Sequence, residues 1–283
     1  MCIPQVGYMC VRSQLAGIVI PTLGTRNELL IQSLLSVRAA GPSFVAIVAP
    51  NPAEIQRTVD RSLFDLVIPD PGIGLAGAIN SGVESLPDDI SFFNWLGDDD
   101  LLSPHSLQRT IQALHQRPKA AAVFGGCTYI DTEGTVLWNN KSGSFAKLLM
   151  RFGPQLIPQP GALIRRSEFD RIGGLNSQYK WAFDLDMFIR LSQIGDLIYL
   201  PENLASFRWH PDSLSVKGRT NSVLEASRIR RDHYPKWLSK LFVPWEFAMT
   251  RMILRAGRVL TSSSRVGNQF GIGSFMWPPS KRV

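Results

Sequence analysis

Apolar runs alternate with stretches of helical periodicity over the first 116 residues of the chain. The run LAGIVI at 15–20 predicts a buried strand that ends at Pro21, and the spacing of the following leucines predicts a helix over 27–40. The same alternation predicts further strands at 44–49, 66–68 and 91–96 and helices at 52–63, 75–86 and 103–116. Four consecutive strand–helix units are typical of an α/β fold with a parallel, doubly wound sheet.

Polar residues mark where two of these helices should begin. Asn51 stands before Pro52, and Ser103 stands before Pro104, so we expect Asn51 and Ser103 to cap their helices. Ligands of open α/β sheets bind at the carboxyl ends of the strands. The functional residues should therefore lie in the loops that follow Ile20, Ala49, Ile68 and Leu96.

The pattern loosens after residue 118. We expect a strand at 120–124, a hairpin over 128–138 that turns at Glu133-Gly134, a helix at 182–193 and a short strand at 197–200. The segment 143–171 is rich in proline and glycine, which favours loops. The second half should therefore be less regular than the first.

Residues 72–77 read GIGLAG and fit the glycine pattern of a dinucleotide-binding turn. They follow a strand and open a helix, and Asp98 lies about 20 residues further on, where that motif has its ribose-binding acid. However, the turn is in the third strand–helix unit, Asp70-Pro71 separates strand from glycines, and three acids stand in place of one. We favour an ordinary glycine-rich turn, and a nicotinamide-dependent oxidoreductase is the alternative function.

Three adjacent carboxylates, Asp98, Asp99 and Asp100, follow the strand at 91–96. Two charges about 4 Å apart repel by about 4 kcal/mol at an effective dielectric near 20, so a cation must offset them. A hard divalent ion, Mg²⁺ or Mn²⁺, would do so and would also bind a substrate diphosphate. The alternative is a solvated acidic turn in which Asp99 or Asp100 caps the next helix.

Charged and aromatic residues gather again in the second half. Asp184 and Asp186 stand at the start of an otherwise apolar helix, where acids commonly complement the helix dipole. Further on, Arg208, Trp209 and His210 place a cation, an aromatic ring and an imidazole side by side. Each segment by itself also fits a purely structural role.

Taken together, these segments resemble the family 2 inverting glycosyltransferases, which have the GT-A fold. The resemblance covers about residues 15–215, through the motifs IVIPT, DPGIGLAGAINSG, FFNWLGDDDLLSP, IPQPGALIRRSEFDRIGGLNSQY, AFDLDMFIRL and FRWHPDSLS. It implies a Rossmann-like, mostly parallel sheet with helices on both faces. It also implies a metal-dependent hexosyltransferase that moves a sugar from a nucleotide diphosphate donor to an acceptor hydroxyl with inversion.

The resemblance and the distribution of charge together suggest a division of the chain. Residues 15–118 would form the donor-binding half and residues 119–236 the acceptor-binding half of one domain. Residues 1–14 would be an N-terminal tail, and residues 237–283 a basic, amphipathic helical extension.

Nucleotide contacts are implied for four residues. Pro21 and Thr22 match the strand end that lines the nucleotide base in this family, and Asp70 and Asn80 match positions near the nucleotide. Two stretches depart from the family pattern: ANP at 49–51 lacks the acid that holds uracil, and an isoleucine precedes Asn80 where relatives carry arginine. The donor could therefore carry UDP, dTDP or GDP.

The acidic turn matches the DxD motif of the family. The resemblance implies that Asp98 and Asp100 hold Mn²⁺ or Mg²⁺, and that Asp98 and Asp99 contact the donor. Arg208 matches a segment that closes over the diphosphate, and His210 matches a residue that approaches the metal.

Asp184 matches the catalytic base of the family, at the acceptor-side helix start. It would deprotonate an acceptor hydroxyl, which attacks the anomeric carbon in a single inverting displacement. Trp181 and Asp186 are the implied acceptor contacts. No covalent nucleophile is needed, and the sequence shows no Ser/His/Asp or Cys/His arrangement to supply one.

The net charge of +7 is concentrated at the end of the chain. Residues 228–283 hold 11 Lys and Arg against 2 Asp and Glu, a net +9, while the preceding residues carry −2. A helix predicted over 241–260 places apolar residues on one face and Arg251 and Arg255 on another. It could pack on the catalytic domain or bind an anionic membrane surface. Nucleic acid is not the partner that we expect, because no binding motif accompanies the charge.

Three cysteines, Cys2, Cys10 and Cys127, form no disulfide framework or zinc motif, which fits a reducing compartment. No apolar run approaches the roughly 18 residues of a membrane span, and the start lacks a secretory signal pattern. We therefore expect a cytoplasmic enzyme, peripheral on the inner face of the membrane. Its acceptor would be a carbohydrate or a lipid-linked molecule of cell-surface polysaccharide or glycolipid assembly. The alternative is a non-catalytic scaffold of the same fold that works through its basic tail.

Overall fold

The structure is a computed structural model, and it describes residues 15–140, 143–209, 218–234 and 244–252. His210, the tail 1–14 and most of the extension 237–283 therefore lie outside the described residues.

The first half of the chain alternates strands and helices, as the sequence predicts. Its elements are β1 (Ala16–Pro21), α2 (Asn27–Ala40), β2 (Ser43–Ala49), α3 (Pro52–Thr58), a 3-10 turn η1 (Arg61–Leu63), β3 (Leu66–Pro69), α4 (Leu75–Glu84), β4 (Phe92–Trp95), β5 (Leu101–Leu102) and α5 (Ser106–Gln116).

The second half is less regular. Its elements are β6 (Ala120–Ile130), β7 (Val136–Asn140), α6 (Phe145–Phe152), β8 (Leu163–Arg165), α7 (Arg166–Arg171), α8 (Phe183–Ile194), β9 (Asp196–Arg208) and α10 (Arg219–His233). Residues 244–252 are also helical.

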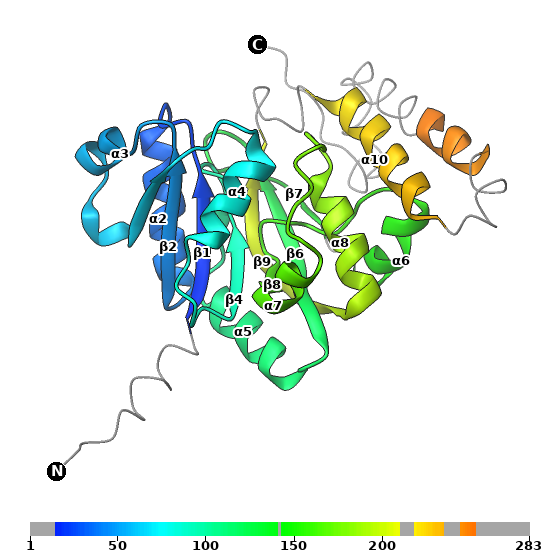
Figure 1. The fold of residues 1–283 in the computed structure, drawn as a ribbon, viewed down its shortest axis with the longest axis horizontal. Helices are drawn as coiled ribbons and strands as arrows, with labels where there is room; N and C mark the ends of the chain where they lie inside the picture. Colours follow the sequence, from blue (N-terminus) through cyan, green and yellow to red (C-terminus); the bar gives the residue numbers. More distant parts are fainter. Residues whose placement is uncertain (1–14, 141–142, 210–217, 235–243, 253–283) are drawn as a thin grey trace.

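Strands from both halves form one nine-stranded sheet (Figure 1). Its order is β3-β2-β1-β4-β8-β6-β9-β5, and β7 pairs with β6. The strands β3, β2, β1 and β4 are parallel, whereas β8 is antiparallel to both β4 and β6. The sheet therefore begins as the doubly wound arrangement that the sequence predicts and then changes direction at β8.

Each face of the sheet packs against its own set of helices. Val19 belongs to the core with α4, α7 and α8, while its neighbours Ile18 and Ile20 belong to the core with α2 and α5. Adjacent residues of a strand point to opposite faces, so the continuous apolar run of β1 serves both cores. At Gly82 in α4, an added Cβ would collide with the side chain of Val19, so this glycine lets the helix lie directly on β1.

The helix expected over 52–63 is divided. Asn51 accepts a hydrogen bond from the Glu54 amide at 3.3 Å, which confirms the predicted cap. At Val59 the backbone turns extended, and the Asp60 carboxylate caps the separate turn η1 instead. Val59 is buried, so packing of its side chain accompanies the break.

The expected start of the fourth helix is wrong. Helix α5 begins at Ser106 with His105 before it, because the Ser103 amide donates to the Leu204 carbonyl of β9 at 2.9 Å. Leu101 and Leu102, just before Ser103, form β5 and pair with β9. This pairing is a tertiary contact, which the local sequence pattern does not predict.

The segment 143–171, expected to be loops, contains α6, β8 and α7. The strands expected at 120–124 and 197–200 are much longer, since β6 and β9 pair in parallel along most of their length. The hairpin at 128–138 is confirmed, with Gly134 in a left-handed conformation at its turn. Within the described residues, no helix has the length and hydropathy needed to cross a lipid bilayer.

Candidate functional site

The acidic turn lies at the carboxyl end of β4, between β4 and β5. Asp98, Asp99 and Asp100 are 6%, 9% and 5% exposed, so the turn is buried, and the solvated acidic turn considered above is wrong. Nor does it cap α5, whose N-terminus lies beyond β5. Burial of three carboxylates is costly unless hydrogen bonds and cations accompany them.

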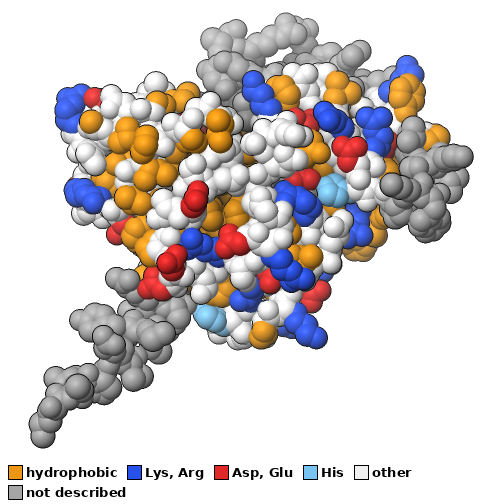
Figure 2. Space-filling model, viewed as in Figure 1, with side chains coloured by type: hydrophobic (Ala, Val, Ile, Leu, Met, Phe, Trp, Pro, Cys, Tyr) orange, Lys and Arg blue, Asp and Glu red, His pale blue; other side chains and the backbone are white. Residues whose placement is uncertain are grey.

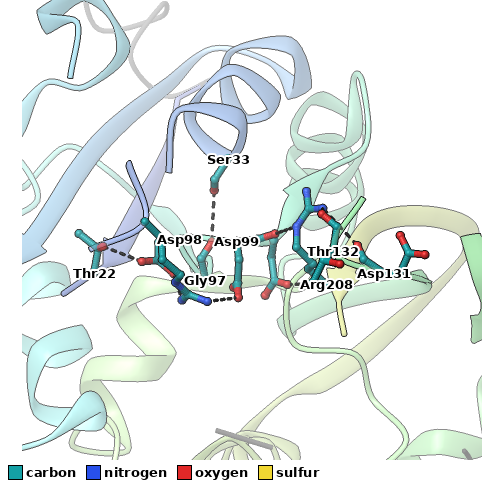
Figure 3. A network of polar contacts seen from close by, with 10 residues as sticks. Thr22, Ser33, Gly97, Asp98, Asp99, Asp131, Thr132 and Arg208 are labelled. Carbon is teal, nitrogen blue, oxygen red and sulfur yellow. Dashed lines mark hydrogen bonds and ion pairs between the residues drawn. The ribbon is translucent and has the colours of Figure 1, made fainter. Parts of the chain in front are cut away.

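Two residues that follow β1 hold the first carboxylate. The Thr22 hydroxyl donates to Asp98 Oδ2 at 2.6 Å, as Figure 3 shows. The guanidinium of Arg26 forms ion pairs with Asp98 and with Asp99, the latter at 2.8 Å from Nη1 to Oδ2. Thr22 therefore lies where the sequence predicts a donor contact, and Arg26 is a member of the site that sequence reasoning missed.

Arg208, at the end of β9, holds the other side of the turn (Figure 3). Its backbone amide donates to Asp100 Oδ1 at 2.9 Å, and its Nε donates to the Asp99 carbonyl at 3.0 Å. Its Nη1 donates to the carbonyls of Asp131 and Thr132 at 3.2 and 2.9 Å, and its Nη2 donates to Gln32 Oε1 at 3.0 Å. The side chain is 3% exposed, so in this structure Arg208 locks the acidic turn to the hairpin after β6.

The electrostatics of the turn favour an added cation. Burial raises the pKa of Asp98, while the Thr22 hydroxyl and the Arg26 charge lower it. Burial and the neighbouring Asp99 charge raise the pKa of Asp100 well above its ordinary value. The two arginines thus offset the carboxylate charges incompletely.

The residues of the turn fit a divalent metal ion. A Cβ on Gly97 would lie 3.0 Å from Asp99 Oδ1 and 2.8 Å from Asp100 Oδ2, so both carboxylate oxygens lie beside the bare backbone of this glycine. Carboxylate oxygens are the ligands that Mg²⁺ and Mn²⁺ prefer. Among the described residues, no group of three His, Cys, Asp or Glu side chains forms a metal site. Substrate oxygens would have to complete the coordination.

Asp184 lies in the first turn of α8 and is only partly exposed. Burial raises the pKa of Asp184 to about 6, although the Leu185 amide, which donates at 2.8 Å, and the amide of Gln155 lower it. The negative charge of Glu225 on α10 raises it further. A carboxylate with this pKa is ionised at neutral pH and can accept a proton.

Asp186, two residues on, has the opposite environment. Its Oδ2 accepts from Arg190 Nε at 2.8 Å, and its Oδ1 lies 2.9 Å from His233 Nε2 on α10. These bonds outweigh burial and hold the pKa of Asp186 below its ordinary value. Both carboxylate oxygens of Asp186 therefore bond side chains that join α8 to α10 or lie on α8 itself.

The charges of both acidic regions act on Tyr129. Burial raises the pKa of its phenol, and the charges of both Asp100 and Asp184 contribute to the increase. Tyr129 is near the end of β6, in register with Phe207 on β9. The acidic turn and the start of α8 therefore lie within electrostatic reach of the same side chain.

The other sequence-predicted residues have varied surroundings. Pro21 ends β1 and is partly exposed. Asp70 accepts from the Gly72 amide at 2.8 Å in an exposed loop. The Asn80 amide exchanges two hydrogen bonds with the Leu175 backbone, at 2.8 and 2.9 Å, so it joins α4 to the loop after α7. Trp181 is partly exposed beside the start of α8.

Arg26, Glu225 and His233 are the contacts that sequence reasoning missed. Arg26 follows β1 by five residues, so its position in the first strand–helix loop was a usable signal. Glu225 and His233 lie on α10, for which no element was expected, and only the tertiary structure brings them to α8.

Comparison with known proteins gives a structural answer only. No protein-family model matches the sequence, and no curated protein is similar to it at a significant level. Solved structures, in contrast, match with a probability of 1.00.

Three of these structures are glycosyltransferases. A mannosyltransferase from Pyrobaculum calidifontis, PcManGT, solved with GDP-Man and Mn²⁺, has a TM-score of 0.59 and 13% identity over 87% of this chain and 75% of its own. One structure of S. aureus TarS has a TM-score of 0.57 and 11% identity over 83% of this chain and 72% of its own. GalNAc-T7, solved with UDP, GalNAc and Mn²⁺, has a TM-score of 0.55 and 13% identity over 76% of this chain and 47% of its own. The chain therefore has the GT-A-like fold of nucleotide-sugar glycosyltransferases.

Proposed function

We propose that the chain is a metal-dependent, inverting glycosyltransferase of the hexosyltransferase type. It moves a sugar from a nucleotide diphosphate to an acceptor hydroxyl. One observation carries the proposal. The acidic turn is buried and its negative charge is only partly balanced by arginines, and a separate aspartate, Asp184, has a pKa of about 6. Both lie within electrostatic reach of Tyr129. These settings suit the two tasks of the reaction, which are to hold a diphosphate and to remove a proton.

The acidic turn is the proposed donor site. Asp98 and Asp100 would hold Mn²⁺ or Mg²⁺, with Asp99 beside them, and His210 is a further proposed ligand. The ion, when bound, supplies positive charge to the departing diphosphate. Arg26 and Arg208 hold the conformation of the turn, because Arg26 pairs with the Asp98 carboxylate and Arg208 donates to the Asp99 carbonyl.

The nucleotide would lie against the ends of β1 and β3. Pro21 and Thr22 flank the acidic turn on one side, and Asp70 and Asn80 are the proposed contacts on the other. PcManGT was solved with GDP-Man and GalNAc-T7 with UDP, which supports testing both nucleotides. The stretch 49–51, which lacks an acid for uracil, supports including dTDP as well.

Asp184 is the proposed general base. Its carboxylate accepts the proton of the acceptor hydroxyl while the oxygen attacks the anomeric carbon from the side opposite the diphosphate. One displacement of this kind inverts the anomeric configuration. Trp181 is the proposed acceptor contact. Asp186 orients α8 through its bonds to Arg190 and His233.

Binding measurements test the proposal directly. We expect GDP, UDP or dTDP to bind only with Mn²⁺ or Mg²⁺, and EDTA to remove the affinity. Asp100→Asn should lose metal-dependent binding, while Asp232→Asn, an exposed change on α10, should retain it. Diphosphate affinity that EDTA leaves unchanged would contradict the proposal. NADH binding in the same assay would instead favour the oxidoreductase that the glycines at 72–77 suggest.

We further propose that the enzyme associates peripherally with an anionic membrane, from the cytoplasmic side, to meet a lipid-linked or other carbohydrate acceptor of cell-surface polysaccharide or glycolipid assembly. Residues 244–252 support this, because Trp245, Phe247 and Met252 are 52%, 63% and 61% exposed beside Arg251. Exposed aromatic and basic residues on one helix favour a lipid interface. In the view of Figure 2, acidic side chains are spread among the basic ones over the body.

Sedimentation with anionic liposomes tests the membrane proposal. The full chain should pellet at low salt, and a chain ending near residue 236 should not. A Phe247→Ala and Met252→Ala double variant keeps the charge and should bind more weakly. Equal pelleting of all three proteins, or none by the full chain, would contradict the membrane proposal and leave only the packing of this helix on α10 through the Arg230–Glu246 ion pair.

A further inference from the structure

The start of α8, which carries Asp184, has no cap of its own. Ala182 occupies the N-cap position and makes no side-chain hydrogen bond. The first backbone amides of a helix need acceptors, and a side chain with oxygen usually supplies one. Here a carboxylate from another helix binds the backbone amides that lead into α8.

Glu225 on α10 supplies that acceptor. Its Oε1 accepts from the Lys180 amide at 2.9 Å, and its Oε2 accepts from the amides of Trp181 and Ala182 at 2.7 and 2.8 Å. One carboxylate therefore binds three consecutive backbone amides, immediately before the helix turn that carries Asp184. Hydrogen bonds to an ionised acceptor are shorter and stronger than neutral ones, and negative charge is favourable at a helix N-terminus.

Two contacts hold helix α10 near its C-terminal end. His233 Nε2 lies 2.9 Å from Asp186 Oδ1 on α8. Arg230, three residues earlier, makes a bidentate ion pair with Glu246, at 2.6 and 3.1 Å, and both side chains are 2% exposed or less. Glu225 thus acts from an anchored helix, so it can fix the position of the turn.

We propose that Glu225 is a positioning residue for glycosyl transfer: its carboxylate holds the turn at 180–182 so that Asp184 faces the acceptor hydroxyl. The inference rests on the proposed function, in which Asp184 is the base. Glu225 itself need not touch substrate, since it is occupied by three backbone amides. Its charge has a second effect, because it makes the Asp184 carboxylate more basic.

Three variants separate position from charge. Glu225→Ala removes the acceptor, Glu225→Gln keeps one acceptor oxygen but removes the charge, and Asp232→Asn removes one charge from an exposed site on the same helix. We expect kcat to fall about 100-fold in Glu225→Ala and about 10-fold in Glu225→Gln, with the donor KM unchanged. Asp232→Asn should match the wild type.

The pH profile gives a readout that loss of structure alone would not move. Among the described residues, the charge of Glu225 from α10 acts on Asp184, and the charge of Asp184 acts on the phenol of Tyr129 from β6. Asp186 is on the same helix as Asp184, where it bonds Arg190 and His233. The acid limb of kcat should move to lower pH in Glu225→Gln, because one negative charge near Asp184 is gone. It should not move in Asp232→Asn.

Hydrogen exchange and an NMR titration of Asp184 need no activity. The amides of 180–182 should exchange at least about 10-fold faster in both Glu225 variants than in Asp232→Asn, and the Asp184 carboxyl should titrate lower in Glu225→Gln. Wild-type exchange and titration in Glu225→Gln, or wild-type kcat in Glu225→Ala, would overturn the inference. If the wild type transfers no sugar while exchange and titration change as expected, the proposed function fails and the role of Glu225 toward Asp184 stands.

Discussion

The two acidic regions of this protein differ in how their charges are offset. The strand-end turn buries three carboxylates and brings Arg26 and Arg208 to them from segments far away in sequence. On α8, Asp186 bonds Arg190 and His233. Within the described part of the chain, Asp184 has hydrogen bonds from amides only, and burial together with the charge of Glu225 raises its pKa. Carboxylates with cationic partners therefore serve to stabilise the fold or to bind a ligand, whereas Asp184, to which only amides of the described residues donate, can act as a base.

The largest effect is expected at the acidic turn. Asp100→Asn should reduce transfer by at least about 1000-fold, because the loss of its charge removes a proposed metal ligand. Asp98→Asn should weaken transfer less, since Asp99 keeps its ion pair with Arg26. Initial rates with saturating Mn²⁺ measure both effects, and thermal unfolding checks that each variant is folded. Near-normal activity of Asp100→Asn would contradict the assignment.

The next effect distinguishes the two acids of α8. Asp184→Asn should lower kcat by about 100-fold or more and leave donor affinity nearly unchanged, because the amide cannot accept the proton. Asp186→Asn is the matched control, two residues along the same helix, and should retain most of the chemistry per folded molecule. An inactive Asp186→Asn together with an active Asp184→Asn would reverse the assignment.

The pH dependence sharpens the same contrast. Asp184 must be ionised to act, and its pKa is about 6, so kcat should fall about tenfold per pH unit below pH 6. Above pH 7 this group should impose no further change. Rates between pH 4.5 and about 8, with metal and donor kept saturating, give the profile. An acid limb near pH 4, the ordinary range of an aspartate, would exclude Asp184 as the base.

Two further effects concern the stability of the fold, and they have opposite signs. The folded-state pKa of Asp184 is raised, so its ionisation costs stability as pH rises through about 6. Asp184→Asn should therefore be more stable than the wild type at pH 8, by about 3 kcal/mol at most, with no difference below about pH 3.8.

The pKa of Asp186 is lowered, so its contribution is present above the unfolded pKa and is lost as pH falls through the folded one. Asp186→Asn should be less stable at pH 8 by about 1–3 kcal/mol, and the loss should shrink in acid. Urea unfolding at both pH values measures the pair. Equal shifts in the two variants would show that their environments do not differ.

Local pattern was sufficient for most strands and helices in the first half of the chain, apart from the division of the helix after Thr58, strand β5 and the start of α5. The periodicity of residues 27–40 predicts α2 with the observed bounds, and Asn51 caps α3 as its residue type and position suggest. The apolar strand followed by three aspartates located the acidic turn. These features depend on neighbouring residues, so the sequence carries them directly.

The rest was decided by contacts between distant segments. Strand β5 exists because it pairs with β9, and helix α5 starts late for the same reason. Arg26 and Arg208 bond the buried acidic turn from distant segments. Glu225 binds the backbone amides just before α8 from a helix that the sequence analysis did not predict. The residue types of Asp184 and Asp186 are identical in the sequence. Their protonation behaviour differs because burial and neighbouring charges, which depend on the folded chain, shift a pKa.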